Sequence, residues 1–531
     1  MLLQVTLPLT FLLLFLWYQW RKRHFQVFLK LGIPGPQPNV IFGNFLEVFR
    51  NGFIETHKKW IKKYGKVVGY YIGLKPVLLV TDTDLLKNIQ IKEFHKFPNR
   101  PLLYGERVNT NDKRRINLLF LKGTEWKEMR SLVTPSFTTS KMKMMSPIMN
   151  DSIDTLLENL NEKCQSGETF DVYTLFKRLT IDVIGRTAFG IQTNVQKNPD
   201  DPLLRLAHLM FNFPFQFISA LISSAFNHLS HVMRLFRLFG GFRANKGRHP
   251  VEELFDRCKV IIETRRENPS QKKVDLLQQL IDAEVKENTK VDDESLIAGD
   301  TEKENMLRER IESNEGKKSR HLTTDELISN AFLFLLAGYE TTSTALAFCT
   351  MMLVNYPEVQ ENIRREVNEL LEREGCLNYD SVHKLQYLDA VFSEILRLYP
   401  PIYLFVNRET VEDAQYGSYK IPKGMAIQVP VYLLHRDEDY WPDAEKFIPE
   451  RFFPENRNKN NPMAWQPFGS GPRNCVGMRF AQMEAKMAIA KILKKFYLKP
   501  CKNTDKHPLK LQVGLSIIRP KYGVPIKVEY V

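Results

Sequence analysis

The sequence predicts a mainly α-helical protein with a small β-rich subdomain, built as a single large domain. The segment 325–355 is a long apolar run that stops at Tyr356-Pro357, which is typical of one long helix. Two short runs of apolar and β-branched residues, 67–72 and 77–80, lie between Gly and Pro residues, as strands do. No low-complexity linker divides the 531-residue chain into independent cores between Gly32 and Tyr356, and no internal repeat is found.

The N-terminus is expected to form a single membrane anchor, residues 1–24. The run 5–20 is almost wholly apolar, and the basic cluster 21–24 follows at once. Positive charge on this side of an apolar span favours a cytoplasmic location for the chain that follows. A cleaved signal peptide would carry positive charge before the apolar run and small residues at its cleavage site, and this sequence has neither. We therefore expect a retained anchor in the endoplasmic reticulum membrane, with mitochondrial import as the alternative.

Two further segments stand apart from the helical body, 39–531. Residues 25–38 include Gly32-Ile33-Pro34-Gly35-Pro36-Gln37-Pro38, which favours a stiff, non-helical hinge. Residues 284–320 are crowded with Glu, Lys, Asp, Asn and Ser and have little apolar periodicity. That composition predicts a solvated, mobile loop, for which a regulatory or partner-binding role stays open.

Cys475 carries the strongest functional signal. It lies in the segment 468–477, Phe-Gly-Ser-Gly-Pro-Arg-Asn-Cys-Val-Gly, and the sequence predicts that a helix begins at the cysteine. A helix N-terminus, a nearby arginine and a metal ion all favour a thiolate over a thiol. The simpler interpretation of a lone cysteine is a buried structural residue, but five positions at fixed spacing favour a metal ligand. They are Phe468, Gly471, Arg473, Cys475 and Gly477.

This string resembles the haem-binding signature of the cytochromes P-450, the haem-thiolate monooxygenases. The resemblance extends from about residue 30 to the end of the chain and implies the cytochrome P-450 fold. It implies haem b with the Cys475 thiolate as axial ligand, Arg473 paired with a haem propionate, and Gly471 and Gly477 leaving room for the macrocycle. The segments 134–138 and 337–343 look closest to the animal microsomal branch that oxidises drugs and steroids.

The middle of the long apolar helix contains the motif Ala337-Gly338-Tyr339-Glu340-Thr341-Thr342. It resembles the family's oxygen-binding motif, in which an acid and an alcohol sit beside the haem. By that resemblance Thr341 donates a hydrogen bond to bound oxygen and Glu340 helps relay protons, so that the O–O bond breaks with loss of water. Ala337 and Gly338 would keep this face thin enough for dioxygen and substrate. The alternative is that the hydroxyl groups bond back to their own helix.

Three more residues resemble haem propionate partners, which a buried dicarboxylate requires. Trp126 and Arg130 are four residues apart on a predicted helical segment and resemble the family's Trp-x-x-x-Arg clamp. Arg408 lies where the family supplies a further propionate contact. Each of the two arginines is equally well explained as an ordinary surface residue.

A structural network is predicted behind the cysteine loop. Glu394 and Arg397 are three residues apart and share one face of a largely apolar helix, so their ion pair is expected to be buried. The pair resembles the family's Glu-x-x-Arg motif, and Arg451 would complete a Glu-Arg-Arg network. A buried ion pair needs further polar partners.

The charge balance indicates an acidic partner or surface. The chain has 75 Lys and Arg against 61 Asp and Glu, a net charge of +14. It has no zinc-finger spacing, RNA-binding signature or basic heptads, which argues against nucleic acid. Membrane lipid and an acidic redox protein fit better. Five basic residues flank segments that, by the resemblance, lie near the thiolate side of the haem: Lys127, Lys141, Lys143, Arg479 and Lys486.

The redox partner must be another protein, because the chain has no Gly-x-Gly-x-x-Gly loop or flavin motif. The resemblance implies electrons from NADPH through a flavoprotein reductase, with a small b-type cytochrome as a second donor. The six cysteines have no paired spacing, which fits a reducing compartment. The sequence thus predicts a monooxygenase of the endoplasmic reticulum membrane, with its catalytic domain cytoplasmic, that oxidises a lipophilic xenobiotic, steroid or fatty-acid-like molecule.

Two alternatives stay open. One is a haem-thiolate isomerase of a lipid peroxide, which would not need the proton delivery that Thr341 implies. The other is a non-catalytic binder of haem or lipid, in which a broken oxygen-binding motif would be expected, whereas Glu340 and Thr341 are both present.

Overall fold

The computed structural model describes residues 2–101, 103, 116–211, 250–268, 275–282, 284–286, 319–404 and 406–531. The chain divides into two compact units. Of the described residues, the first unit comprises 2–101, 103, 404 and 406–434, and the second comprises 116–211, 250–268, 275–282, 284–286, 319–403 and 435–531. The predicted small β-rich subdomain corresponds to the first unit, which contains the four-stranded sheet. The described chain is mainly helical, as predicted.

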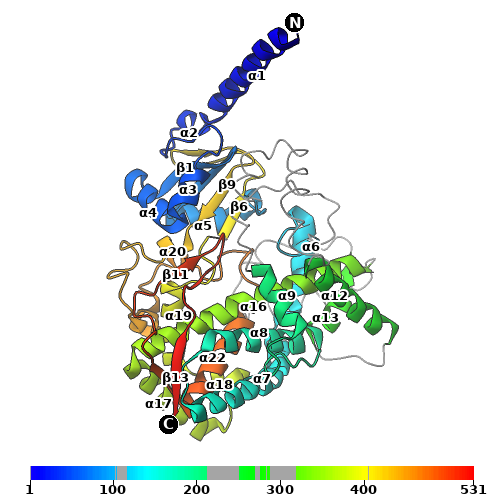
Figure 1. The fold of residues 1–531 in the computed structure, drawn as a ribbon, viewed down its shortest axis with the longest axis vertical. Helices are drawn as coiled ribbons and strands as arrows, with labels where there is room; N and C mark the ends of the chain where they lie inside the picture. The colour runs from blue at the N-terminus through cyan, green and yellow to red at the C-terminus, as the bar shows by residue number, and fades with distance from the viewer. Residues whose placement is uncertain are drawn as a thin grey trace. The chain divides into compact units, whose positions relative to one another are not determined.

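The first unit is organised around a four-stranded sheet with the order β1-β2-β9-β6 (Figure 1). Strand β1 (Val67–Ile72) pairs antiparallel with β2 (Lys75–Val80), and β2 pairs in parallel with β9 (Ala426–Val429). Strand β6 (Val406–Glu409) closes the sheet antiparallel to β9, and β7 (Ala414–Tyr416) and β8 (Tyr419–Ile421) form a separate hairpin. The prediction for β1 is confirmed, and β2 begins two residues earlier than predicted.

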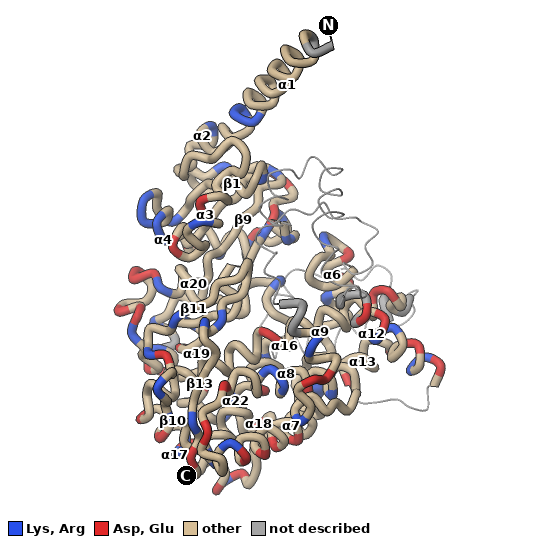
Figure 2. The backbone as a smooth tube through the Cα atoms, viewed as in Figure 1, with Lys and Arg blue, Asp and Glu red and all other residues tan. Residues whose placement is uncertain are grey.

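Short helices and one long helix accompany this sheet. They are α1 (Leu2–His24), α2 (Val27–Lys30), α3 (Phe45–Asn51), α4 (Phe53–Tyr64), α5 (Thr83–Lys87), η1 (Asn88–Lys92), η2 (Phe94–Lys96) and α20 (Val431–Leu434). Helix α1 has exposed apolar side chains along its length, and its basic residues gather at its C-terminal end (Figure 2). One of them, Arg21, is fully buried, lies over the rings of Trp17 and Phe25, and donates to the Ile41 carbonyl oxygen.

The proline-rich segment is non-helical, as predicted, and it is bound to the sheet. Residues 33–38 form no helix or strand, and the Gly69 amide of β1 donates to the Pro34 carbonyl oxygen at 2.9 Å. The Phe28 ring packs against Gly69, where a Cβ would lie 2.4 Å from ring atoms. Only glycine therefore fits at this position. The start of the body is thus anchored against β1.

The second unit is mainly helical (Figure 1). Its α-helices are α6 (Gly123–Val133), α7 (Thr139–Ser166), α8 (Val172–Phe189), α9 (Pro202–Phe211), α12 (Pro250–Glu267), α13 (Leu276–Asp282), α16 (Thr324–Asn355), α17 (Pro357–Glu374), α18 (Tyr379–Val382), α19 (Gln386–Leu398), α21 (Pro454–Arg457) and α22 (Met478–Lys495). Three short 3-10 helices are η4 (Thr134–Phe137), η6 (Pro449–Phe452) and η7 (Pro462–Ala464).

Small sheets complete the second unit. Strands β10 (Phe496–Pro500), β13 (Pro525–Tyr530) and β3 (Phe170–Asp171) form one antiparallel sheet in that order, and β11 (Leu511–Val513) pairs with β12 (Ile518–Pro520). Strands β4 (Glu284–Lys286) and β5 (Ser319–His321) also pair. The expectation of a loop over all of 284–320 is therefore wrong at its two ends, and residues 287–318 lie outside the described part of the chain.

Helix α16 is the centre of the second unit. Its N-terminus is closed by a capping box, in which Thr323 accepts from the Glu326 amide and the Glu326 side chain accepts from the Thr323 amide. The helix packs against α8, α12, α19 and α22. Among the described helices it is the one long and apolar enough to cross a membrane, yet 72% of its most apolar window is buried within the protein. The prediction of a core helix is confirmed.

Candidate active site

The Cys475 loop turns tightly before α22. The Cys475 amide donates to the Phe468 carbonyl oxygen at 2.8 Å, and the Asn474 amide donates to the Gly471 carbonyl oxygen at 2.9 Å. Gly469 (φ 74°) and Gly471 (φ 70°) adopt left-handed conformations that side chains other than glycine rarely reach. The loop closes on itself in this way and leaves the Cys475 side chain exposed.

Two details of the loop differ from the predictions. Helix α22 begins at Met478, so Cys475 lies three residues before the helix and not at its first residue. Gly477 has an ordinary φ of −89°, and a Cβ there would meet Phe137 at 3.8 Å, a normal contact. The backbone therefore requires glycine at positions 469 and 471 but not at 477.

The other thiols are poorer ligand candidates. Burial raises the pKa of Cys258 to about 12, and it also raises the pKa of Cys349, so both stay protonated at neutral pH. Cys164 and Cys501 are half-buried, and Cys376 is exposed. Of the six cysteines, only Cys475 combines exposure with a glycine-rich loop.

Two arginines bring positive charge to this loop. On α6, Arg130 donates through both Nη atoms to Asn474, at 3.0 Å to its carbonyl oxygen and 2.8 Å to its Oδ1. Arg473 lies 4.1 Å from the ring centroid of Trp126 and donates to the Leu121 carbonyl oxygen at 2.9 Å. Both guanidinium groups are buried, and buried positive charge favours an anion nearby. The structure thus brings together Trp126, Arg130 and Arg473 beside the predicted ligand.

Arg408 lies in the first unit, on β6, where it is fully buried. Burial, and then the charge of Arg100, lowers the pKa of Arg408 to about 9. Arg100 was not recognised from the sequence, because only the bridge between Asn99 and Glu409 brings it close to Arg408. Two neighbouring guanidinium groups at a buried position suit an anion such as a carboxylate.

The predicted oxygen-binding motif has one open face on a mostly buried helix. Ala337 is exposed and Thr341 is half-buried, whereas most residues of α16 are buried. The two residues are one helical turn apart and share a face. The Thr341 hydroxyl donates to the Ala337 carbonyl oxygen at 2.6 Å, so the alternative of a bond to its own helix is realised in this structure.

Gly338 is half-buried, as Thr341 is, and it also packs against α8. A Cβ at position 338 would lie 2.7 Å from the Ile184 side chain on α8. The missing Cβ therefore allows α16 and α8 to pack closely, and a role of Gly338 beside dioxygen stays a prediction.

Glu340 points into a buried polar cluster rather than along the face of Thr341. Its Oε1 accepts from the Tyr173 hydroxyl at 2.9 Å and lies 3.5 Å from Arg519 Nη1 and 3.7 Å from Lys177 Nζ. Successive side chains on a helix diverge by about 100°. In this conformation the side chains of Glu340 and Thr341 therefore have different hydrogen-bond partners, and no direct hydrogen bond supports the predicted proton relay between them.

The partners of Glu340 were not found from the sequence. Tyr173 and Lys177 are on α8, and Arg519 is on β12, more than 150 residues from Glu340 in each case. Burial, and then the charge of Glu340, raises the pKa of Tyr173 well above its usual value, so this hydroxyl keeps its proton and remains a donor. The sequence offers one usable signal: Tyr173 and Lys177 are four residues apart, so they could have been expected to share one face of a helix.

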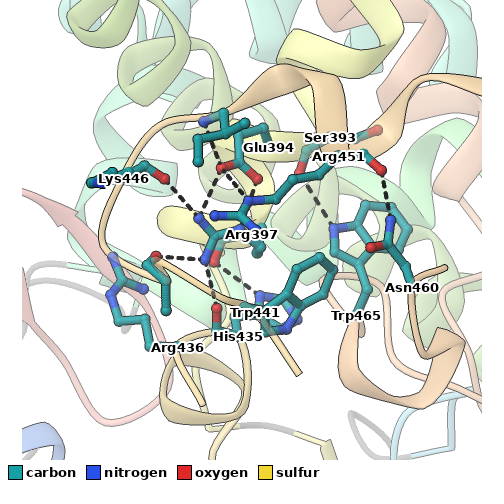
Figure 3. A network of polar contacts seen from close by, with 12 residues as sticks. Ser393, Glu394, Arg397, His435, Arg436, Trp441, Lys446, Arg451, Asn460 and Trp465 are labelled. Atoms are coloured by element: carbon teal, nitrogen blue, oxygen red, sulfur yellow. Dashed lines mark hydrogen bonds and ion pairs between the residues drawn. The ribbon is translucent and has the colours of Figure 1, made fainter. Parts of the chain in front are cut away.

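The predicted Glu-Arg-Arg network is present, and its Glu394–Arg397 pair is fully buried (Figure 3). Arg397 Nε and Nη2 bind the two carboxylate oxygens of Glu394 at 2.7 and 2.8 Å. Arg397 also donates to the carbonyl oxygens of His435, Ala444 and Lys446. Every guanidinium edge of Arg397 thus has an acceptor.

Arg451 joins this network at longer range. Its Nε lies 3.6 Å from Glu394 Oε1, and the Ile448 amide donates to the same oxygen at 2.9 Å. The Arg451 guanidinium donates mainly to the carbonyl oxygens of Pro442 and Asp443. The predicted network is confirmed, with backbone carbonyls as its principal acceptors.

One predicted surface residue is buried. Lys486 on α22 has 3% of its side chain exposed and pairs with Asp389 of α19, so it cannot contribute to a basic docking face. Lys143 is exposed but pairs with Asp380, while Lys127, Lys141 and Arg479 are half-buried.

The residues of the second unit suit a haem group. Cys475 offers an exposed thiol, Arg130 and Arg473 offer buried positive charge for propionates, and the open face at Ala337 and Thr341 leaves apolar surface uncovered. A thiolate ligand and cationic carboxylate partners are the donor set that such a group requires.

Comparisons with known proteins agree with this donor set. A model of the family Cytochrome P450 matches residues 33–526. Cytochrome P450 3A12 of Canis lupus familiaris is 34% identical over 507 residues, which cover 95% of this chain and 92% of that protein. Cytochrome P450 3A7 of Homo sapiens is 33% identical over 96% of this chain and 93% of its own length. Thromboxane-A synthase of Rattus norvegicus is 32% identical over 99% of this chain and 96% of its own length. The chain therefore belongs to the cytochrome P450 family of haem-thiolate enzymes.

Proposed function

We propose that this protein is a membrane-bound monooxygenase that inserts one oxygen atom from O₂ into a lipophilic xenobiotic, steroid or fatty-acid-like substrate. Electrons come from NADPH through a flavoprotein reductase, with a b-type cytochrome as a second donor, and the other oxygen atom leaves as water. The observation that carries this proposal is the open face of α16, where Thr341 presents a hydroxyl group in a family of haem-thiolate enzymes. A hydroxyl at that place serves oxygen activation, which an inert binder would not need.

The residues of the chain have distinct tasks in this reaction. Haem, held by the Cys475 thiolate, supplies the redox chemistry. Arg130 and Arg473 hold propionate charge, and Trp126 keeps Arg473 in place by stacking. The Thr341 hydroxyl can turn from the Ala337 carbonyl oxygen to donate to oxygen and to accept a proton in return. The Glu340 carboxylate accepts a hydrogen bond from Tyr173. To exchange a proton with Thr341, its side chain would have to rearrange or a water molecule would have to bridge the two.

A second candidate is isomerisation of a lipid peroxide, which the similarity to a thromboxane-A synthase favours. The two functions differ in their need for electrons. For the monooxygenase we expect product from lipophilic substrates only when NADPH and reductase are both present. Turnover of a lipid peroxide at an undiminished rate without NADPH would contradict the monooxygenase and support the isomerase.

The membrane location rests on α1. Its apolar side chains are exposed, Leu7 by 57% and Phe11 by 64%, and its basic residues lie in its last turn. Exposed apolar surface of this kind is costly in water and favourable in lipid. Helix α16, which by length and composition alone could cross a membrane, is mostly buried within the protein. We therefore propose that α1, whose exposed side chains are apolar, anchors the protein in the endoplasmic reticulum membrane with the catalytic part on the cytoplasmic side.

Basic residues near the cysteine loop should recruit the reductase. We expect that the double change Lys127→Glu and Lys141→Glu slows the first electron transfer by about tenfold at low ionic strength, because electrostatic steering depends on the charge of the docking face. Stopped-flow reduction under carbon monoxide measures this rate. The matched control is Lys58→Glu with Lys62→Glu on α4, which alters the net charge equally. Equal slowing in both double variants would argue against a docking face.

A further inference from the structure

His435 lies between the Glu-Arg-Arg network and the chain that leads to the cysteine loop, and it was not recognised from the sequence. It is fully buried. Its Nδ1 lies 3.0 Å from the Arg397 carbonyl oxygen, and its Nε2 lies 2.8 Å from the Gln466 amide nitrogen. Arg397 in turn donates to the His435 carbonyl oxygen at 2.7 Å (Figure 3). His435 and Arg397 thus hold each other reciprocally.

These partners determine which ring nitrogen carries the proton. The Gln466 amide can only donate, so Nε2 of His435 must accept. The Arg397 carbonyl oxygen can only accept, so Nδ1 must carry the proton and donate. Burial, and then the charge of Arg397, lowers the pKa of His435 to about 3, so the ring stays neutral at physiological pH. Each ring nitrogen of His435 therefore has one fixed role: Nδ1 donates a hydrogen bond and Nε2 accepts one.

The arrangement continues from Gln466 to the cysteine. The Gln466 carbonyl oxygen accepts from the Gly469 amide at 3.0 Å, and the Phe468 carbonyl oxygen accepts from the Cys475 amide at 2.8 Å. Gly469 itself has a left-handed conformation. The turn from Gln466 to Gly469 therefore depends on where Gln466 is held. One imidazole thus joins Arg397 of α19 to the base of the cysteine loop.

The same stretch of chain is held at two other points. Trp465 Nε1 donates to the Ser393 carbonyl oxygen of α19 at 3.3 Å (Figure 3). Trp441 Nε1 donates to the Ala464 carbonyl oxygen at 3.3 Å. Those two bonds end at residues 464 and 465, and the bond from Gln466 to His435 is the next one along the chain. It is the closest of the three to Cys475 in sequence.

We infer that His435 is a positioning residue for the cysteine ligand: its neutral imidazole transmits the position of Arg397 to the Gln466 amide and so holds the loop in the geometry that presents Cys475. This inference rests on the proposed haem-thiolate function. It assigns to a histidine that touches neither cofactor nor substrate a role in maintaining thiolate ligation.

The test compares two substitutions that differ in one hydrogen bond. His435→Phe keeps an aromatic ring but leaves the buried Gln466 amide without an acceptor. His435→Gln places an amide oxygen near the position of Nε2 and can accept from that amide. We expect the reduced, carbon monoxide-bound His435→Phe protein to lose its red-shifted Soret band roughly ten times faster than the wild type, the factor that one unsatisfied buried donor represents. His435→Gln should stay within about threefold of the wild type.

A control and a second measurement separate positioning from general destabilisation. His57 of the first unit is also fully buried and neutral, with a pKa lowered to about 3 by burial, so His57→Phe should keep the wild-type rate of band loss. Amide exchange in peptides covering 464–475 should be about tenfold faster in His435→Phe, with or without haem.

The outcomes are distinct. A wild-type band with unchanged exchange and unchanged band loss in His435→Phe would overturn the inference alone. Equal band loss in His435→Phe and His57→Phe would also overturn it. A wild-type protein without the red-shifted band would overturn the proposed function, and the exchange measurement would then decide whether His435 still positions the loop.

Discussion

Replacing Cys475 with serine should abolish thiolate ligation and with it the catalytic function. The serine hydroxyl has the size of the thiol but is not ionised at neutral pH and donates far less charge to iron. We expect the reduced, carbon monoxide-bound wild-type protein to show a strongly red-shifted Soret band, and the variant to show none. Turnover should fall by more than about 100-fold, since changes one shell further out already cost 10–100-fold.

Cys376→Ser is the matched control for this experiment. Cys376 is the other exposed cysteine, and it has no glycine-rich loop or arginine pair around it in sequence. This variant should keep both the red-shifted band and the activity. A band that survives in Cys475→Ser, or disappears in Cys376→Ser, would contradict the assignment of Cys475 as the ligand.

Removing one partner of the buried Glu394–Arg397 pair should produce the largest loss of stability. In Glu394→Gln, the Arg397 guanidinium would stay buried with full charge and without its carboxylate. Such an uncompensated charge costs about 3–5 kcal/mol, a large part of the stability of a typical protein. We therefore expect a lower midpoint of urea unfolding and a lower haem content after expression.

The neighbouring pair Arg436–Glu445 provides the control. Their atoms are 3.2 Å apart, but the Glu445 side chain is 64% exposed. Exposed pairs contribute about 1 kcal/mol or less, so Glu445→Gln should shift the unfolding midpoint only slightly. Equal shifts in Glu394→Gln and Glu445→Gln would show that the buried network does not have the structural role assigned to it.

The corrected position of Glu340 changes how proton delivery is understood in this protein. The sequence places Glu340 and Thr341 side by side, which suggests a direct relay. In the structure Glu340 belongs to a cluster with Tyr173, Lys177 and Arg519, while Thr341 lies on the open face. In the proposed function, proton supply through Glu340 would therefore depend on Tyr173, Lys177 and Arg519 as well as on Glu340 itself.

The sequence by itself determined the features that depend on neighbouring residues. The glycine loop before α22, the capping box at Thr323 and the strand β1 follow from turn preferences, caps and runs of apolar residues, and each is found in the structure. The spacing of Glu394 and Arg397 also determined their ion pair, because residues three apart share a helix face.

Only the tertiary structure decided which distant residues meet. Gly338 faces Ile184 because α8 packs there, and Lys486 is buried because α19 brings Asp389 beside it. Arg100 reaches Arg408 through strand pairing, and His435 meets Gln466 through the packing of the chain behind the cysteine loop. Local sequence sets the conformation of a turn or helix, but the direction in which a side chain finds its partner is set by packing between segments that are far apart in the chain.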